Sequence, residues 1–436
     1  MEIEEILSRS KKVSEEAEVF WISSEETPVE FEANRLKRLE TNQGTVVVLR
    51  IIKGGRIGLA TTTRLDDPEE LINIAVEMSQ FGARASFELP SQIVYPEVQV
   101  YDPGVEAVSI EEMVGLGDSL ISMVRGYNPE LVCDGTVARS ISQARIINSR
   151  GGEGSYKRSV FSIMIEGTLV RGTDMLFVGE ADSSCRPIRD VGQMARSVRE
   201  QLERAENLAL VSTKKLPVIF TPKGVASALV MPLALAFNGK TVLEGASPLG
   251  GRQGELLFDK KLTIQDDATI PHRPQSRPYD DEGMPSQRNP LIDGGVVGGF
   301  LYDLQTAGLA HTRSTGSAAR LRGGMPSPSV STIIIGEGDA SFDNMVRDIK
   351  EGLVVEMLIG AGQGNILGGE FGGNVLLGYK VENGQIVGRV KDTMISGNVY
   401  EVLRDVAAIG SEARWVGGAL KAPSIYLPWI SVSSKA

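Results

Sequence analysis

The chain has 436 residues, of which 42% are hydrophobic and 23% are charged, as in an ordinary soluble globular protein of two or three domains. Its net charge of -11 and pI near 5.0 disfavour a nucleic-acid-binding surface, because such surfaces are basic. Only two cysteines are present, Cys133 and Cys185, which excludes a disulfide framework and a four-cysteine zinc site.

The sequence favours a cytoplasmic protein. Its N-terminus is acidic and lacks the basic-then-apolar order of a signal peptide. The longest strongly apolar run, residues 226–237, is far shorter than the ~20 residues that a membrane-spanning helix needs. We therefore expect a cytoplasmic location, free thiols and no membrane partner.

Helices and strands alternate in the first part of the chain. Ile3, Ile6 and Leu7 have helical spacing, and residues 18–22 and 29–32 are expected to be extended. A hairpin is predicted from 45–52, a turn at 53–55 and a second strand at 56–61. Two helices should follow, one started by the short acids and proline at 66–68, the other by a capping box at 109–112 and running to about 125.

Antiparallel β structure is expected between residues 131 and 183. The predicted strands are 131–140, 142–147, 159–169 and 175–178, with glycine turns between them. An amphipathic helix over 188–207 then leads to a buried strand at 216–220.

The remaining half is β-rich and dense in glycine. Prolines across 270–289 exclude regular structure there, so a long loop is expected, and long loops are often functional. Ten glycines fall between 360 and 388, a pattern typical of bulged or tightly curved strands. We predict an α+β protein with an N-terminal domain of mixed helices and antiparallel strands at 1–210 and a β-rich C-terminal domain at 211–436.

The acids Asp280, Asp281 and Glu282 are the first candidates for acid/base chemistry. Three successive carboxylates repel one another, so burial would require a cation or neighbouring arginines, which occur at positions 273, 277 and 288. Taken alone, the segment is most simply a solvated turn before Gly283.

Other chemistry has little support in the residues. The only histidines, His272 and His311, are 39 positions apart, and a zinc site would need both plus a third ligand. No Gly-x-Ser-x-Gly elbow stands out. The glycine-rich stretch 360–364 lacks the Gly-Lys-Ser/Thr ending of a phosphate loop.

The segment from Pro278 through the acids to Gly294 resembles the signature of the TldD/PmbA family. Stretches 147–152, 410–415 and 422–424 are similar to other family motifs, the last two in their PmbA or TldE form. This resemblance spans nearly the whole chain. It implies an α+β N-terminal domain, a β-rich C-terminal domain and dimers of clasped subunits.

TldD-type members carry a His-Glu-x-x-x-His zinc motif and a late cysteine ligand, and this chain matches neither. The corresponding stretch, residues 224–239, has no histidine, cysteine or acid, and no cysteine follows Cys185. Neither metal ligands nor a general base can be carried over, so no catalytic residue and no cofactor are assigned here, and zinc is expected in a TldD-type partner. Pro232 should break or restrict the apolar helix that replaces the zinc motif.

The resemblance favours a non-catalytic PmbA/TldE-type subunit of a cytosolic metallopeptidase, acting on unfolded peptides as a heterodimer with a TldD-type subunit or as a homodimer. Asp280, Asp281, Glu282, Gly283, Gly294 and His272 are then family-motif or peptide-binding candidates. One alternative is an autonomous peptidase with a site near His272, Asp281 and Glu282. Another is a protein-binding modulator of DNA gyrase without hydrolytic activity. Whether the isolated chain is an enzyme stays open.

Overall fold

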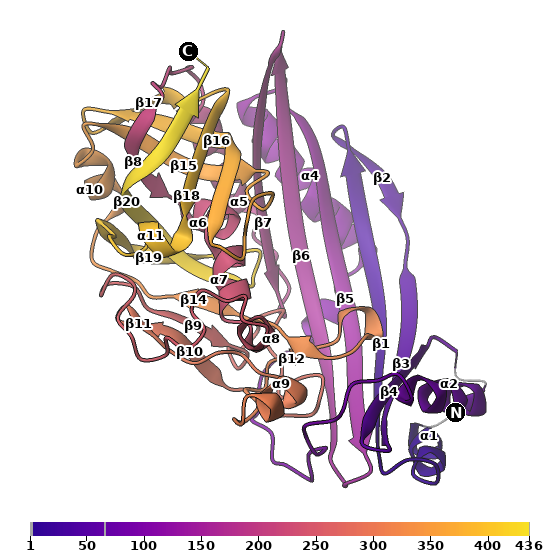
Figure 1. Ribbon diagram of the computed structural model, residues 1–436. Coiled ribbons are helices and arrows are strands. Elements are labelled where there is room, and N and C mark those ends of the chain that lie inside the picture. Colours follow the sequence, from indigo (N-terminus) through magenta and orange to yellow (C-terminus); the bar gives the residue numbers. More distant parts are fainter. Residues whose placement is uncertain (1–2, 65–66, 436) are drawn as a thin grey trace.

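The computed structural model describes residues 3–64 and 67–435 and contains two large β-sheets with helices, an α+β fold (Figure 1). Within the described residues, no helix combines the length and apolar character needed to cross a membrane.

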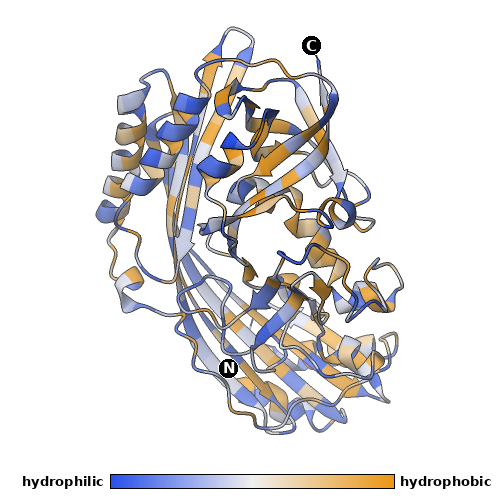
Figure 2. Ribbon diagram, turned by 90° about the vertical axis from the view of Figure 1, so that its left-hand side faces the viewer, coloured by the Kyte–Doolittle hydropathy of each residue, from blue (hydrophilic) through white to orange (hydrophobic). Residues whose placement is uncertain are grey.

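The first sheet is antiparallel throughout and has the strand order β4-β3-β1-β5-β6-β7, with β2 also paired to β1. Its strands are β1 (Glu16–Glu32), β2 (Arg35–Leu39), β3 (Asn42–Lys53), β4 (Arg56–Thr62), β5 (Val132–Asn148), β6 (Glu153–Arg171) and β7 (Asp174–Ser184). The long central strands alternate between buried and exposed residues, visible as changing hydropathy along them in Figure 2.

Helices cover this sheet, and their starts follow local capping chemistry. They are α1 (Ile3–Ser10), α2 (Pro68–Ser79), α3 (Pro103–Glu106), α4 (Ile110–Tyr127) and α5 (Gly192–Arg204). The Asp67 side chain accepts a hydrogen bond from the Glu70 amide, and Ser109 does the same for Glu112, as the capping patterns predict. Asp66, the other acid of the first pattern, lies outside the described residues.

The second sheet contains a ring of five strands. In the order β8, β15, β16, β18 and β20, each strand pairs with the next, and β20 pairs back with β8. The ring is formed by β8 (Lys214–Phe220), β15 (Glu351–Ile359), β16 (Glu370–Glu382), β18 (Thr393–Asn398) and β20 (Leu420–Ser434). We call this closed part the barrel; it has no open edge of its own.

Shorter strands extend the barrel sheet or lie beside it. They are β9 (Ile264–Asp267), β10 (Arg288–Asp293), β11 (Val296–Val297), β14 (Ile333–Ile335), β17 (Gln385–Arg389) and β19 (Ala408–Val416), with the separate pair β12 (Ala318–Ala319) and β13 (Ser327–Pro328). The associated helices are α6 (Pro222–Ala228), α7 (Val230–Ala236), α8 (Gly239–Leu243), α9 (Leu304–Leu309), η1 (Leu321–Gly323), α10 (Phe342–Arg347) and α11 (Val399–Val402).

The two sheets share an apolar core. One cluster of buried side chains takes Phe31 and Phe161 from the first sheet, and Ile219 and Leu377 from the barrel. Figure 1 shows the barrel lying against one side of the long strands of the first sheet. The two halves therefore pack as one continuous body rather than as domains joined by a solvated linker.

Several expected boundaries differ in the structure. The extended segments 18–22 and 29–32 form one strand, β1, and the two strands expected between 131 and 147 form β5. The expected helix 188–207 is shorter, as α5. The apolar helix breaks at Leu229 into α6 and α7, with Pro232 in the first turn of α7, where a missing amide costs no hydrogen bond.

Candidate functional site

The acidic triplet lies in the loop before β10 and is largely buried. Asp280 is 0% exposed and Glu282 1%, which corrects the expectation of a solvated turn. The Asp280 carboxylate accepts backbone hydrogen bonds from Glu282 and Met284 on one oxygen and from Ala318 on the other, each at 2.9 Å. Gly283 has φ +74, a backbone conformation that favours glycine, so the turn at this position favours a residue without a side chain.

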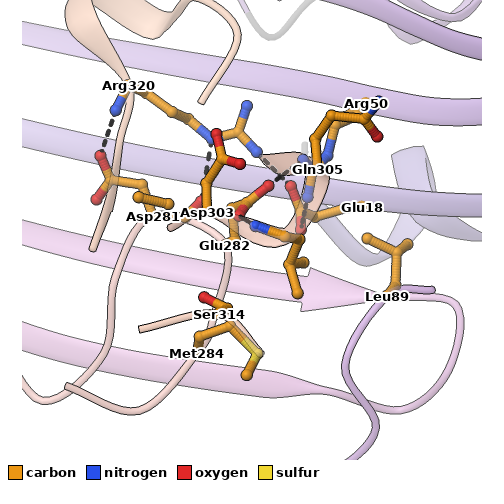
Figure 3. Close-up of polar contacts among 12 residues, drawn as sticks. Glu18, Arg50, Leu89, Asp281, Glu282, Met284, Asp303, Gln305, Ser314 and Arg320 are labelled. Carbon is orange, nitrogen blue, oxygen red and sulfur yellow. Dashed lines mark hydrogen bonds and ion pairs between the residues drawn. The ribbon is translucent and has the colours of Figure 1, made fainter. Parts of the chain in front are cut away.

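Glu282 reaches across to the first sheet (Figure 3). It pairs with Arg50 of β3, whose guanidinium also binds Glu18 of β1 at 2.8 Å, and Glu18 pairs in turn with Arg320. All four side chains are at most 2% exposed. The second Glu282 oxygen accepts the Leu304 amide at 2.7 Å. We call Glu18, Arg50, Glu282 and Arg320 the interdomain ion network, since Glu18 and Arg50 come from the first sheet and Glu282 and Arg320 come from loops of the C-terminal half.

Asp281 joins the same region through arginines. Arg277 donates to one of its oxygens at 2.9 Å, and the Arg320 amide donates to the other at 2.7 Å. Of the three arginines near the triplet in sequence, Arg277 neutralises it directly, whereas Arg273 stacks on Trp415 at 4.1 Å.

Burial dominates the titration of the network. It raises the pKa of Glu282 to about 7, against the opposing charge of Arg50 and with the help of Asp280. It raises the pKa of Asp280 to about 6, although Arg277 and three backbone amides act the other way. Burial alone would lower the pKa of the Arg50 guanidinium, but the charges of Glu18 and Glu282 outweigh it and raise that pKa. The carboxylates are thus held by arginines and amides inside the protein, which is the pattern of a structural junction.

His272 belongs to a different set of contacts. Its amide donates to the Gln99 carbonyl, and its own carbonyl accepts from the Cys185 amide, with φ +60. Burial lowers the pKa of His272, and the positive charge of Arg186 lowers it further, by a smaller amount. None of the hydrogen bonds found within residues 3–64 and 67–435 joins His272 to the acidic triplet. Gly294, with φ +53, turns the chain between β10 and β11.

The second histidine does not complete a metal site with the first. His311 follows α9 and is exposed. In the part of the chain that the structure describes, no group of three or more His, Cys, Asp or Glu side chains is arranged to hold a metal ion.

Helices α6 and α7 occupy the stretch that the resemblance to TldD-type members matches with their zinc motif. Leu229, Leu233 and Phe237 are buried in the core of the barrel half. Ser227 donates to a carbonyl of its own helix, and Asn238 caps α8 and donates to the Pro328 carbonyl. The side chains available here are therefore hydrocarbon, one hydroxyl, one amide and the thioether of Met231, a donor set without the imidazole, thiolate or carboxylate ligands that zinc takes.

A cavity of about 340 Å³ lies between the two halves of the molecule. One wall comes from β7 and α5, and the other from the start of α6, β15 and β19. Its lining includes Glu180, Arg204, Lys223, Glu356 and Arg414. We call it the interdomain cavity.

The sequence patterns did not single out Glu18, Arg50 or Arg320. A usable signal exists for Arg50, which interrupts the apolar run 46–52 at a position flanked by buried residues on both sides. A charge in such a run indicates a buried partner, but the partners lie 32 and 232 positions away.

Comparisons with known proteins agree with this architecture. Residues 213–434 match the model of the PmbA/TldA metallopeptidase C-terminal domain, and residues 17–79 match domain 1 of the same family. An uncharacterised protein of Methanocaldococcus jannaschii is 26% identical over 98% of both chains, and a metalloprotease of Archaeoglobus fulgidus is 27% identical over 89% of this chain and 90% of its own.

Solved structures show the same fold. TldE from Thermococcus kodakarensis superposes with a TM-score of 0.88 at 24% identity, covering 99% of this chain and 100% of its own. A candidate modulator of a DNA gyrase from Thermotoga maritima gives the same TM-score and coverage at 21% identity. With its C-terminal domain model covering half of the sequence, the chain belongs to the PmbA/TldD family.

Proposed function

We propose that this protein is a PmbA/TldE-type subunit without its own catalytic site in a cytosolic TldD/TldE metallopeptidase complex. The observation that carries the proposal is the α6–α7 stretch. By family resemblance, TldD-type members carry a His-Glu-x-x-x-His zinc motif in this stretch. This chain instead places Leu229, Leu233 and Phe237 there, in an apolar core. A TldD-type partner would supply the zinc ion and activate water.

The names of relatives support a peptidase context. Proteins similar to this chain include those named metalloproteases in Archaeoglobus fulgidus and Methanothermobacter thermautotrophicus and PmbA in Escherichia coli. The fold of TldE from Thermococcus kodakarensis covers the chain end to end. In this proposal the chain forms a heterodimer with the TldD-type subunit, with a homodimer as the state in its absence.

A short open stretch of strand edge near Ala181 would allow this subunit to hold an extended peptide. On either side of it the edge is occupied, because Gln201 holds the Gly179 amide and carbonyl and the Ser183 carbonyl lies against Gly418. Strand β7 ends the order of the first sheet and borders the interdomain cavity through Glu180. Along this edge the Ala181 amide donates to Glu180 and the Ser183 amide to Asp182, both contacts to the preceding residue's side chain. Such local contacts are easily exchanged for the carbonyls of an added strand, a mode of binding that needs little sequence specificity.

Hydrolysis of an unfolded model peptide tests the proposal. The peptide is incubated with this chain, with a TldD-type protein, and with both, in the presence of zinc, and chelator is added to a parallel set. Cleavage only in the mixture, or cleavage strongly enhanced by it, is the expected result. Cleavage by this chain alone that chelator abolishes would show a metal site within it and overturn the proposal.

A further inference from the structure

Glu356 forms part of the wall of the interdomain cavity although it is almost entirely buried. This residue of β15 is 6% exposed, and burial raises the pKa of its carboxyl group despite Lys223 and Arg204. Arg204 Nη1 lies 3.6 Å from one oxygen, and the Thr221 hydroxyl donates to the other at 3.4 Å. Both contacts are long, because charge-assisted hydrogen bonds in proteins are typically about 2.7–2.9 Å. The carboxylate therefore has capacity for a stronger donor.

The neighbouring strand β16 contributes a second buried polar group, the hydroxyl of Tyr379. Tyr379 of β16 is fully buried, and among residues 3–64 and 67–435 its hydroxyl has no hydrogen-bond partner. After burial, the charge of Glu356 is the strongest influence that raises the pKa of this tyrosine, ahead of the opposing effect of Arg204. Buried polar groups in native proteins rarely lack partners. Tyr379 does not line the interdomain cavity, so the group that a ligand there would meet is Glu356, which has only two long contacts.

The cavity has an excess of negative charge. Its lining holds five carboxylates and three cationic side chains. Lys223 is occupied by Glu180 and the Gly179 carbonyl, and Arg204 is stacked on Phe342 at 5.5 Å. At the exposed rim, the carboxylates of residues 343 and 412 and the guanidinium of Arg414 form no ion pair within the described part of the chain, so two unpaired acids stand against one unpaired cation.

We propose that the interdomain cavity binds the cationic side chain of an arginine or lysine residue in an extended peptide, with Glu356 as its principal acceptor. An anionic ligand would face the excess of carboxylates, and an apolar one would leave the buried Glu356 carboxylate with only its two long contacts. A guanidinium carries five N–H donors and can serve both oxygens at once. That the ligand is part of a peptide rests on the proposed function, whereas its charge follows from the cavity itself.

Fluorescence anisotropy with labelled peptides tests the site on the full chain. A short Gly/Ser peptide with one central arginine is compared with the same peptide carrying citrulline, which keeps the shape and removes the charge. The arginine peptide is expected to bind about tenfold more tightly or better, the range seen when a close charge pair is formed. Glu356→Gln should remove that preference.

Two charge variants keep the test decisive if Glu356→Gln fails to fold. Asp343→Asn with Glu412→Gln removes the rim acids from exposed positions and should weaken binding of the arginine peptide without lowering the melting temperature. Glu244→Gln with Glu401→Gln removes two exposed carboxylates outside the cavity lining and should leave binding unchanged.

Equal or undetectable binding of the two peptides would overturn the proposal, as would an unchanged preference in Glu356→Gln. A preference in the isolated chain without any effect on hydrolysis by a TldD-type protein would refute the proposed function alone. Hydrolysis that requires this chain but ignores peptide charge would refute the cavity alone.

Discussion

Replacing Arg50 by methionine removes the central cation of the interdomain ion network. Methionine retains an apolar stem against Phe87, whose ring lies 4.9 Å from the guanidinium carbon. Glu18 keeps Arg320, and Glu282 keeps the Leu304 amide, but the two carboxylates lose the cation between them. Breaking a buried pair by removing one partner costs about 3–5 kcal/mol of unfolding free energy.

This cost converts into a measurable shift in melting temperature. An unfolding entropy of about 2.1 cal/mol/K per residue gives about 0.9 kcal/mol/K for a chain of 436 residues. Arg50→Met should therefore lower the melting temperature by about 3–5 °C in calorimetry at neutral pH. The matched control is Arg145→Met in β5, because the Arg145–Glu4 pair is 38% and 47% exposed and such pairs contribute little.

A double variant separates the ion pair from the loss of packing. Adding Glu282→Leu to Arg50→Met removes the carboxylate that was left without its cation, so the double variant should melt higher than the single one. Equal melting temperatures for Arg50→Met and Arg145→Met would refute the assignment of the network as a buried junction.

Three further measurements follow from the same structure. Because the folded pKa of Glu282 is about 7 and the unfolded value about 4.3, this group's contribution to stability falls as pH rises between these values and is constant above them; the difference in melting temperature between pH 5 and pH 8 should shrink in Glu282→Gln. In Asp280→Asn, only one side-chain oxygen remains for three backbone amides, so the buried Ala318 amide loses its acceptor. The free energy of unfolding in urea should fall by about 1–3 kcal/mol, and an unchanged urea midpoint would contradict this. Gly308→Ala should destabilise far more than Gly299→Ala by thermal melting, because a Cβ at the first would meet a backbone oxygen at 1.8 Å and at the second only at 4.0 Å.

Local sequence signals predicted local structure well. The hairpin of β3 and β4 and the starts of α2 and α4 depend on turn and cap residues only a few positions apart. The break in the apolar helix followed from one residue, Pro232. Each of these features is fixed by atoms that are neighbours along the chain.

Long-range pairing explains what the sequence did not reveal. The expected strands 131–140 and 142–147 are separated at residue 141, yet the backbone there continues as β5 because β1 and β6 pair with it on both sides. The acidic triplet looked solvated for the same reason, since the cations that allow its burial include Arg50 and Arg320, far away in sequence. A hydrophobic pattern predicts which apolar side chains are buried. Whether a charged side chain is buried depends on its partners, which a single sequence does not identify.

The ion network and the shared apolar core contribute differently to the contact between the two halves. Apolar side chains such as Phe31 and Ile219 stabilise the contact by area removed from water, a term that changes little when surfaces shift slightly. The network tolerates no such shift, because Arg50 must reach Glu18 and Glu282 together while Arg320 holds the other Glu18 oxygen. The walls of the interdomain cavity come from opposite sides of this contact. We infer that the apolar core supplies most of the stability of the contact, whereas the network sets the relative position of the two walls.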